Sequence, residues 1–202
     1  MAGPGPATGE HAAGTGTPVH QLRSPMLARL LPELDRIEPR TRVAVSGLPE
    51  SKFRELPPEG GWSIAQVFEH LCLANLSYLD GPLPAAITKS RERGPSEKPW
   101  RPSLIGGWLA SSLAEGARSA PTPTIWRVRG EPRPNVVDAF LRTVERIRAG
   151  ILEADGHDLG VGLASPVSPL IRMNLGDAFR VLVVHGHRHL GQVERTRRAV
   201  GM

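Results

Sequence analysis

Three histidines lie close together near the C-terminal end of the chain, at His185, His187 and His189. Imidazole is a common protein ligand for zinc and nickel, so a metal site is the first chemistry that this cluster suggests. An α-helix turns by about 100° per residue, so residues four apart share a face and residues two apart point in nearly opposite directions. On a helix, His185 and His189 therefore lie together, whereas His187 points away and is interpreted as a surface residue.

The segment from Asn174 to about Val200 is predicted to be the helix that carries this pair. Asn174 is a suitable N-cap, Asp177 stands three residues later, and arginines occupy the last turn, where they favour the helix dipole. The apolar stripe of this helix runs through Leu175, Ala178, Phe179 and Leu182 and continues through His185 and His189. The two histidines are thus expected to face the core.

A further histidine, His70, falls inside the apolar stripe of a second predicted helix. The residues GGWSIAQVFEHL carry a capping box at Ser63 and Gln66, and this helix continues to a break at Gly81-Pro82. Burying an imidazole without a partner is unfavourable, and convergence on a divalent metal would remove that penalty. Three neutral imidazoles suit zinc or nickel and leave a coordination position for water or substrate. We therefore predict His70, His185 and His189 as metal ligands.

The alternative is that these histidines are core residues bonded to backbone carbonyls or carboxylates, because H-x-x-x-H is a weak signal by itself. Gln192 is a candidate to hold the free ring N–H of a ligand, or a polar residue at the edge of the core. Glu69 is interpreted as a surface acid in preference to a partner of a ligand or a general base. Cys72 is interpreted as a small core residue. No role is assigned to His11, His20 and His157.

Two more helices are predicted from apolar periodicity, the first from Pro25 to about Leu48 and the third from Asn135 to just before Gly156. The side chain of Asn135 is expected to cap the third helix. No run shows sustained β alternation, so the fold class is all-α. The simplest arrangement is an antiparallel four-helix bundle with one long crossover connection between helices two and three.

The crossover, residues 81–134, is rich in Pro, Gly and Arg and is expected to hold one short helix around 103–115. Connections of this length are usually functional or disordered. Residues 25–202 are expected to form one domain. They follow a disordered leader, residues 1–24, which has neither the basic nor the apolar region of a secretory signal.

Composition argues against several classes of protein. The formal net charge of +5 invites a nucleic-acid interpretation, but the arginines are scattered among acids and aromatics make up only 4%, too few for base stacking. No apolar stretch is long enough for a membrane span. The single cysteine excludes an internal disulfide and favours the reducing cytoplasm.

Two motifs resemble the DinB-like superfamily over about residues 25–200. W-S-I-A-Q-V-F-E-H-L, Trp62 to Leu71, looks like the family's second helix, and H-x-x-x-H-x-x-Q is similar to its last helix. The resemblance implies a four-helix bundle in which His70, His185 and His189 bind a divalent metal, usually zinc or nickel, in an open site. Relatives include the mycothiol-dependent maleylpyruvate isomerase and bacillithiol transferases, and dimers are common among them.

The resemblance therefore implies a thiol S-transferase in which the metal activates a low-molecular-weight thiol such as mycothiol or bacillithiol, acting on a small-molecule substrate. Arginines of the crossover, such as Arg101 or Arg127, are candidates to receive an anionic substrate. A metal-dependent hydrolase and a non-catalytic metal-binding stress protein remain as alternatives. A homodimer is an expectation drawn from the family alone.

Overall fold

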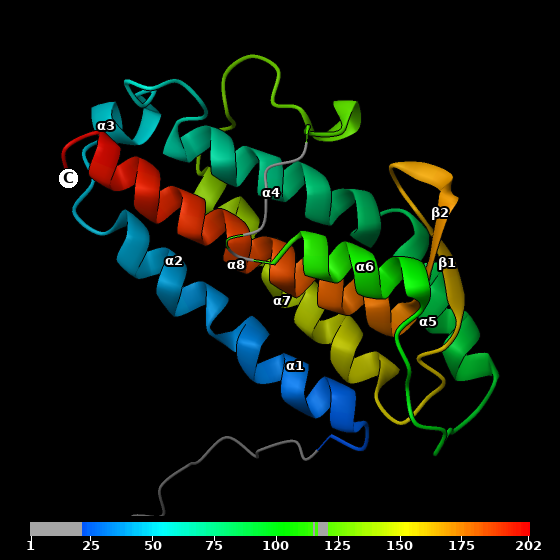
Figure 1. Ribbon diagram of the computed structural model, residues 1–202. Coiled ribbons are helices and arrows are strands. Elements are labelled where there is room, and N and C mark those ends of the chain that lie inside the picture. The colour runs from blue at the N-terminus through cyan, green and yellow to red at the C-terminus, as the bar shows by residue number, and fades with distance from the viewer. Residues whose placement is uncertain (1–21, 115, 117–120) are drawn as a thin grey trace, which may run out of the picture.

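The chain is mostly helical, as predicted, and carries a small antiparallel hairpin that the prediction did not contain (Figure 1). The computed structural model describes residues 22–114, 116 and 121–202, so most of the expected leader lies outside the described residues. The elements are α1 (Pro25–Asp35), α2 (Ile37–Val45), α3 (Glu50–Arg54), α4 (Ile64–Leu79), α5 (Pro82–Glu92), α6 (Leu104–Ser112), the 3₁₀ turn η1 (Thr124–Trp126), α7 (Val136–Ala154), β1 (Gly162–Ser165), β2 (Ser168–Asn174) and α8 (Leu175–Ala199).

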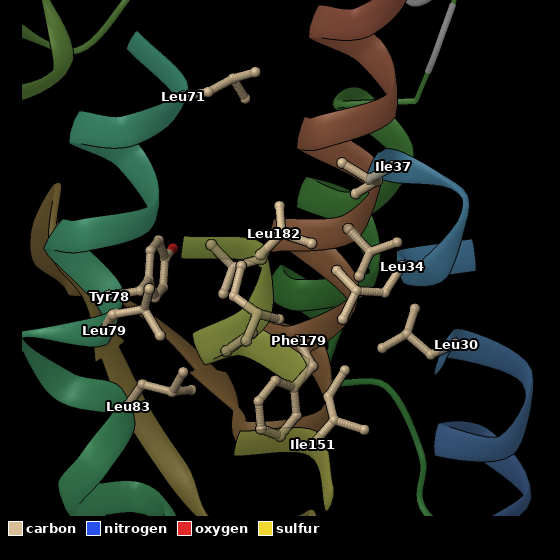
Figure 2. Close-up of a cluster of buried hydrophobic side chains, with 14 of the residues drawn as sticks. Leu30, Leu34, Ile37, Leu71, Tyr78, Leu79, Leu83, Ile151, Phe179 and Leu182 are labelled. Atoms are coloured by element: carbon tan, nitrogen blue, oxygen red, sulfur yellow. The ribbon is translucent and has the colours of Figure 1, made fainter. Parts of the chain in front are cut away.

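The longest helices enclose one apolar core. α4 packs against both α7 and α8, and α1 and α2 pack against the same two helices from the other side (Figure 1). Figure 2 shows the side chains that fill the space between them. Those that it labels are Leu30, Leu34, Ile37, Leu71, Tyr78, Leu79, Leu83, Ile151, Phe179 and Leu182. The predicted apolar stripes therefore face inward.

The first predicted helix is in fact two, because α1 ends at Asp35 and α2 begins at Ile37. Pro39 accounts for the break. Proline has no backbone N–H for the carbonyl of Asp35, four residues earlier, and its ring crowds that carbonyl. The prediction of one continuous helix from Pro25 to about Leu48 was wrong at this point.

The helix starts agree with the sequence in two of three cases. Ser63 and Gln66 form the capping box of α4, and Asn174 and Asp177 form that of α8. At α7, Asn135 is the N-cap residue, but its side chain makes no capping hydrogen bond. Its φ of 53° lies in the left-handed region, which asparagine tolerates better than most residues. The prediction of a side-chain cap there was wrong.

The long crossover contains more structure than expected. The short helix predicted around 103–115 is α6, whereas α5 was not predicted, because Gly81-Pro82 was interpreted as an end only. Proline is also favoured in the first turn of a helix, where its missing N–H is not needed, so the same dipeptide ends α4 and begins α5. Near its end the crossover forms η1 against α4.

The hairpin of β1 and β2 leads directly into α8, because β2 ends at Asn174, the N-cap of that helix. Leu163 pairs with Met173, and the register shifts between Ala164 and Ser165. The strands are short, and buried and exposed residues do not alternate along β2. The sequence therefore shows no period-two pattern that would predict the strands.

Asp177 connects the crossover to the start of α8. One of its carboxylate oxygens accepts backbone N–H groups from Ser103, at the start of α6, and from Asn174. Asp177 is fully buried, and Gly106 of α6 lies directly against its carboxylate. Because one carboxylate serves the N-terminal ends of two helices, the position of α6 is fixed relative to α8.

At the start of the described chain, the backbone N–H groups of Arg23 and Ser24 donate to the carboxylate of Asp155, which follows α7.

Within the part of the chain that the structure describes, no helix combines the length and apolar character needed to cross a membrane.

Gly106→Ala is expected to destabilise the protein by about 1–3 kcal/mol, because the added methyl group would overlap the Asp177 carboxylate in a closely packed contact. Gly107→Ala is the matched control in the same helix. Its new Cβ would meet only Pro102 Cβ at 3.6 Å, and alanine is the better helix former. Urea unfolding of both variants tests this, and equal midpoints would contradict the proposed contact.

Glu194→Gln is expected to remove part of the stability that the protein has at neutral pH. Hydrogen bonds from Arg40 of α2, at 2.7 and 3.0 Å, lower the pKa of Glu194 below its ordinary value despite partial burial. A carboxyl whose pKa is lowered by folding stabilises the protein above its unfolded pKa and loses this effect as the pH falls through the folded pKa.

The side chain of Glu194 is 37% exposed, so solvent screening should keep the effect at about 1 kcal/mol or less. The advantage of the wild type over Glu194→Gln should be present at pH 7 and shrink near pH 3. Glu59→Gln, at an exposed position, is the control. An advantage that does not change with pH would exclude the ion pair as its source.

Candidate metal centre

His70 of α4 and His185 and His189 of α8 converge in the structure. One ring nitrogen of each lies within 4.8 Å of the others, and the Nε2 atoms of His70 and His185 are 3.2 Å apart. His70 and His185 are buried, with 3% and 6% of their surface exposed, and His189 is half-buried. The faces assigned from helical phase are thus confirmed, and residues more than a hundred positions apart form one cluster.

Two of the three rings have a defined tautomer. His70 Nδ1 lies 2.9 Å from the carbonyl oxygen of Trp126, and His189 Nδ1 lies 2.8 Å from Gln192 Oε1. Each oxygen can only accept, so each Nδ1 carries the proton and donates it. The lone pair of each ring is therefore on Nε2. The partner predicted for a ring N–H, Gln192, occupies this place.

The protein holds these rings in the neutral form. Burial lowers the pKa of His70, and the hydrogen bond to the Trp126 carbonyl opposes this only in part. Burial, together with the neighbouring His189 and His70, lowers the pKa of His185 well below its ordinary value. Burial and His70 lower the pKa of His189 to about 3, against the effect of its bond to Gln192. Neutral imidazole is the form that binds metals.

The geometry fits a small divalent cation. With the His70 lone pair on Nε2, the 3.2 Å approach of His185 Nε2 requires either a proton or a cation between them. Two nitrogens bound to one tetrahedral zinc, each about 2.0–2.1 Å from it, lie roughly 3.3 Å apart. A set of three nitrogen donors suits zinc, nickel and related metals, whereas calcium and magnesium prefer oxygen.

Two tryptophans flank the cluster. The ring of Trp62, just before α4, is 4.8 Å from that of His70 and 6.4 Å from that of His189. The ring of Trp126 in η1 is 6.1 Å from that of His185, and its indole N–H donates to Ser77. Packing of these aromatic rings against the imidazoles contributes to the burial of His70 and His185.

Glu69 is not the surface acid that was predicted. It is 9% exposed and receives hydrogen bonds from the guanidinium and the backbone N–H of Arg133 in the crossover, at 2.7–3.1 Å. Burial alone would raise the pKa of Glu69, but Arg133 outweighs it and leaves the pKa lowered. Helical phase could not predict this pair, because Arg133 lies 64 residues from Glu69 and outside the same helix. Glu69 therefore fixes the crossover beside His70.

His187 points away from the other two histidines, as predicted, but it is not a free surface residue. Its Nε2 donates to the carbonyl of Glu33 at 2.9 Å, and its Nδ1 lies 3.3 Å from a guanidinium nitrogen of Arg40. It is half-buried and joins α8 to α1 and α2.

Cys72 is fully buried, as predicted, and burial raises its pKa to about 12, so its thiol stays protonated.

Sequence reasoning missed Trp126 and Arg133, two crossover residues that form hydrogen bonds with side chains of α4. A backbone carbonyl leaves no sequence signal, and Arg133 is one arginine among many. Of the arginines suggested for an anionic substrate, Arg127 donates to the carbonyl of Thr122, and Arg101 is exposed before α6.

Comparison with known proteins gives a family match over most of the chain. The family model described as the DinB superfamily matches residues 33–193, which include all three histidines and Gln192. No match was found among curated proteins or among solved structures.

Gln192→Leu is expected to weaken the binding of Zn²⁺ by about tenfold or more, because it removes the acceptor that orients His189. Gln192→Glu retains an acceptor at the same position and should bind Zn²⁺ at least as tightly as the wild type. Competition with a chromophoric chelator measures both affinities. Equal affinities for the leucine and glutamate variants would show that this hydrogen bond has no part in metal binding.

Proposed function

The chain belongs to the DinB superfamily, and on this premise we propose that it is a metal-dependent enzyme of the thiol S-transferase type. His70, His185 and His189 hold zinc or nickel. The cosubstrate is a low-molecular-weight thiol such as mycothiol or bacillithiol, and the acceptor is a small electrophilic molecule.

The observation that carries this proposal is the convergence of three neutral imidazoles with two tautomers fixed by the chain itself. Histidines that serve only packing need one partner each. Here His70 and His189 already have such partners at Nδ1, and their Nε2 lone pairs are still turned toward one cluster. That surplus of inward lone pairs supports metal binding over the interpretation as core histidines.

The ligand set also favours activation of a bound group over a closed structural site. Three protein ligands are fewer than the four of a typical structural zinc site, so a coordination position is left for an exogenous molecule. When bound, a divalent cation lowers the pKa of a coordinated thiol and supplies a thiolate near neutral pH. Among the described residues, no carboxylate belongs to the cluster, so its ligands bring no negative charge that would oppose a thiolate.

We further infer that residues 25–202 act as one domain, with α1 and α2 together, α4, α7 and α8 as the four members of the family's bundle. Support comes from the mutual packing of these elements around one core. A cytoplasmic setting agrees with the single cysteine, and a homodimer agrees with the family; both belong to this proposal.

The first test is metal content. The purified wild type should contain or bind about one equivalent of zinc or nickel, and His185→Ala should lose it. His157→Ala is the matched control, because His157 bonds to the Asp155 carbonyl outside the cluster. If the wild type binds neither metal, or if both variants bind alike, the proposed centre is wrong.

The second test is a panel of mycothiol, bacillithiol and glutathione with an electrophilic acceptor such as a chlorodinitrobenzene. Thiol consumption by the metal-loaded wild type should exceed that of His185→Ala by at least about a hundredfold, because loss of the cation removes the activation of the thiol. Metal binding without thiol consumption would reject S-transfer. Ester hydrolysis would then indicate a hydrolase, and its absence a binding protein.

A further inference from the structure

A cavity of about 840 Å³ lies on the side of α8 turned away from the candidate metal centre. α8 contributes Arg180, Val183, Val184 and His187 to its lining, and the other walls come from α1, the segment 96–100 and the turn 156–159. His187 is separated from His185 and His189 by about 200° of helix rotation in either direction. The cavity and the histidine cluster therefore belong to different faces of one helix.

Part of the cavity lining is apolar. It includes Met26 and Leu30 of α1, Val183 and Val184 of α8, and Trp100. Trp100 is held in place by a 2.9 Å hydrogen bond from its indole N–H to Asn174 Oδ1. The volume of the cavity lies within the range of sites that take small organic molecules, about 300–1,000 Å³.

The lining also carries cationic groups. The described lining residues include four Lys or Arg residues against two Glu residues. They are Arg23, Arg29, Lys98, Arg180, Glu33 and Glu97. The carboxylate of Glu33 pairs with Arg36 at 2.7 Å and also lies 4.0 Å from Nε2 of His187, and the cationic residues still outnumber the acidic ones in the lining.

Arg29 and Arg180 have no carboxylate partner among the described residues, although Arg180 is half-buried. Most other partly buried arginines of the protein are paired, as Arg40 is with Glu194 and Arg133 with Glu69. A half-buried guanidinium beside an apolar wall gains most from an anionic partner, because charge-assisted hydrogen bonds strengthen where water is displaced.

We propose that this cavity binds an amphiphilic organic anion, with its carboxylate between Arg29 and Arg180 and its apolar part against Met26, Leu30 and Val184. This site is separate from the proposed metal centre and does not depend on the S-transferase proposal.

Calorimetry with decanoate, below its micelle concentration and with the full-length metal-depleted protein, tests the proposal. Decanoate should bind with one equivalent per chain. Decanol, which has the same chain without the charge, should bind at least about tenfold more weakly, the loss expected for one charge-assisted hydrogen bond.

Arg180→Gln and Arg29→Gln should each weaken decanoate binding by about tenfold or more. Arg29 is exposed, so its substitution should leave the fold intact. The Arg29→Gln variant therefore still tests the proposal if Arg180→Gln unfolds the protein. Arg172→Gln, an exposed arginine on β2 outside the cavity, is the matched control and should bind as the wild type does.

His70→Ala separates this site from the histidine cluster and should leave decanoate binding unchanged. The proposal is overturned if decanoate does not bind at millimolar concentration, if decanol binds equally well, or if Arg29→Gln binds like Arg172→Gln. It is also overturned if His70→Ala abolishes binding, because the anion would then occupy the cluster.

Discussion

Three imidazoles, two buried and one half-buried, meet between α4 and α8, and this is the constraint on which the arrangement of the site depends. Polar rings can leave water only if their nitrogens are satisfied, and two helices alone offer few free acceptors, because their carbonyls are already used in helical hydrogen bonds. His189 finds its acceptor one turn away in Gln192, whereas His70 uses the carbonyl of Trp126, from the crossover. The cluster is complete only when the crossover is in place.

The crossover is accordingly fixed at two points by carboxylates of the bundle helices. Near its middle, Asp177 accepts the backbone N–H of Ser103 and holds the start of α6 against α8. At its far end, Glu69 binds Arg133 through both guanidinium and backbone donors. These two buried carboxylates, one on α8 and one on α4, hold a segment that its Pro- and Gly-rich composition would otherwise leave without a defined path.

Sequence reasoning succeeded where local rules decide the outcome. Helical phase placed His70, His185 and His189 correctly, since burial on a helix follows a fixed period. It failed where distant segments meet. The ion pair of Glu69 with Arg133 could not be read from either segment alone. The hairpin was missed for a different reason, because its strands are too short to show alternation.

The carbonyl of Trp126 has a consequence for how the sequence can vary. Any residue type supplies the same oxygen, so the bond to His70 places no demand on the identity of the side chain at position 126. It does demand an unchanged chain length between that carbonyl and the anchor at Arg133, since one added or deleted residue would displace the oxygen. Between Trp126 and Arg133, whose own side chains make the contacts described above, the protein should accept substitutions far more readily than insertions or deletions.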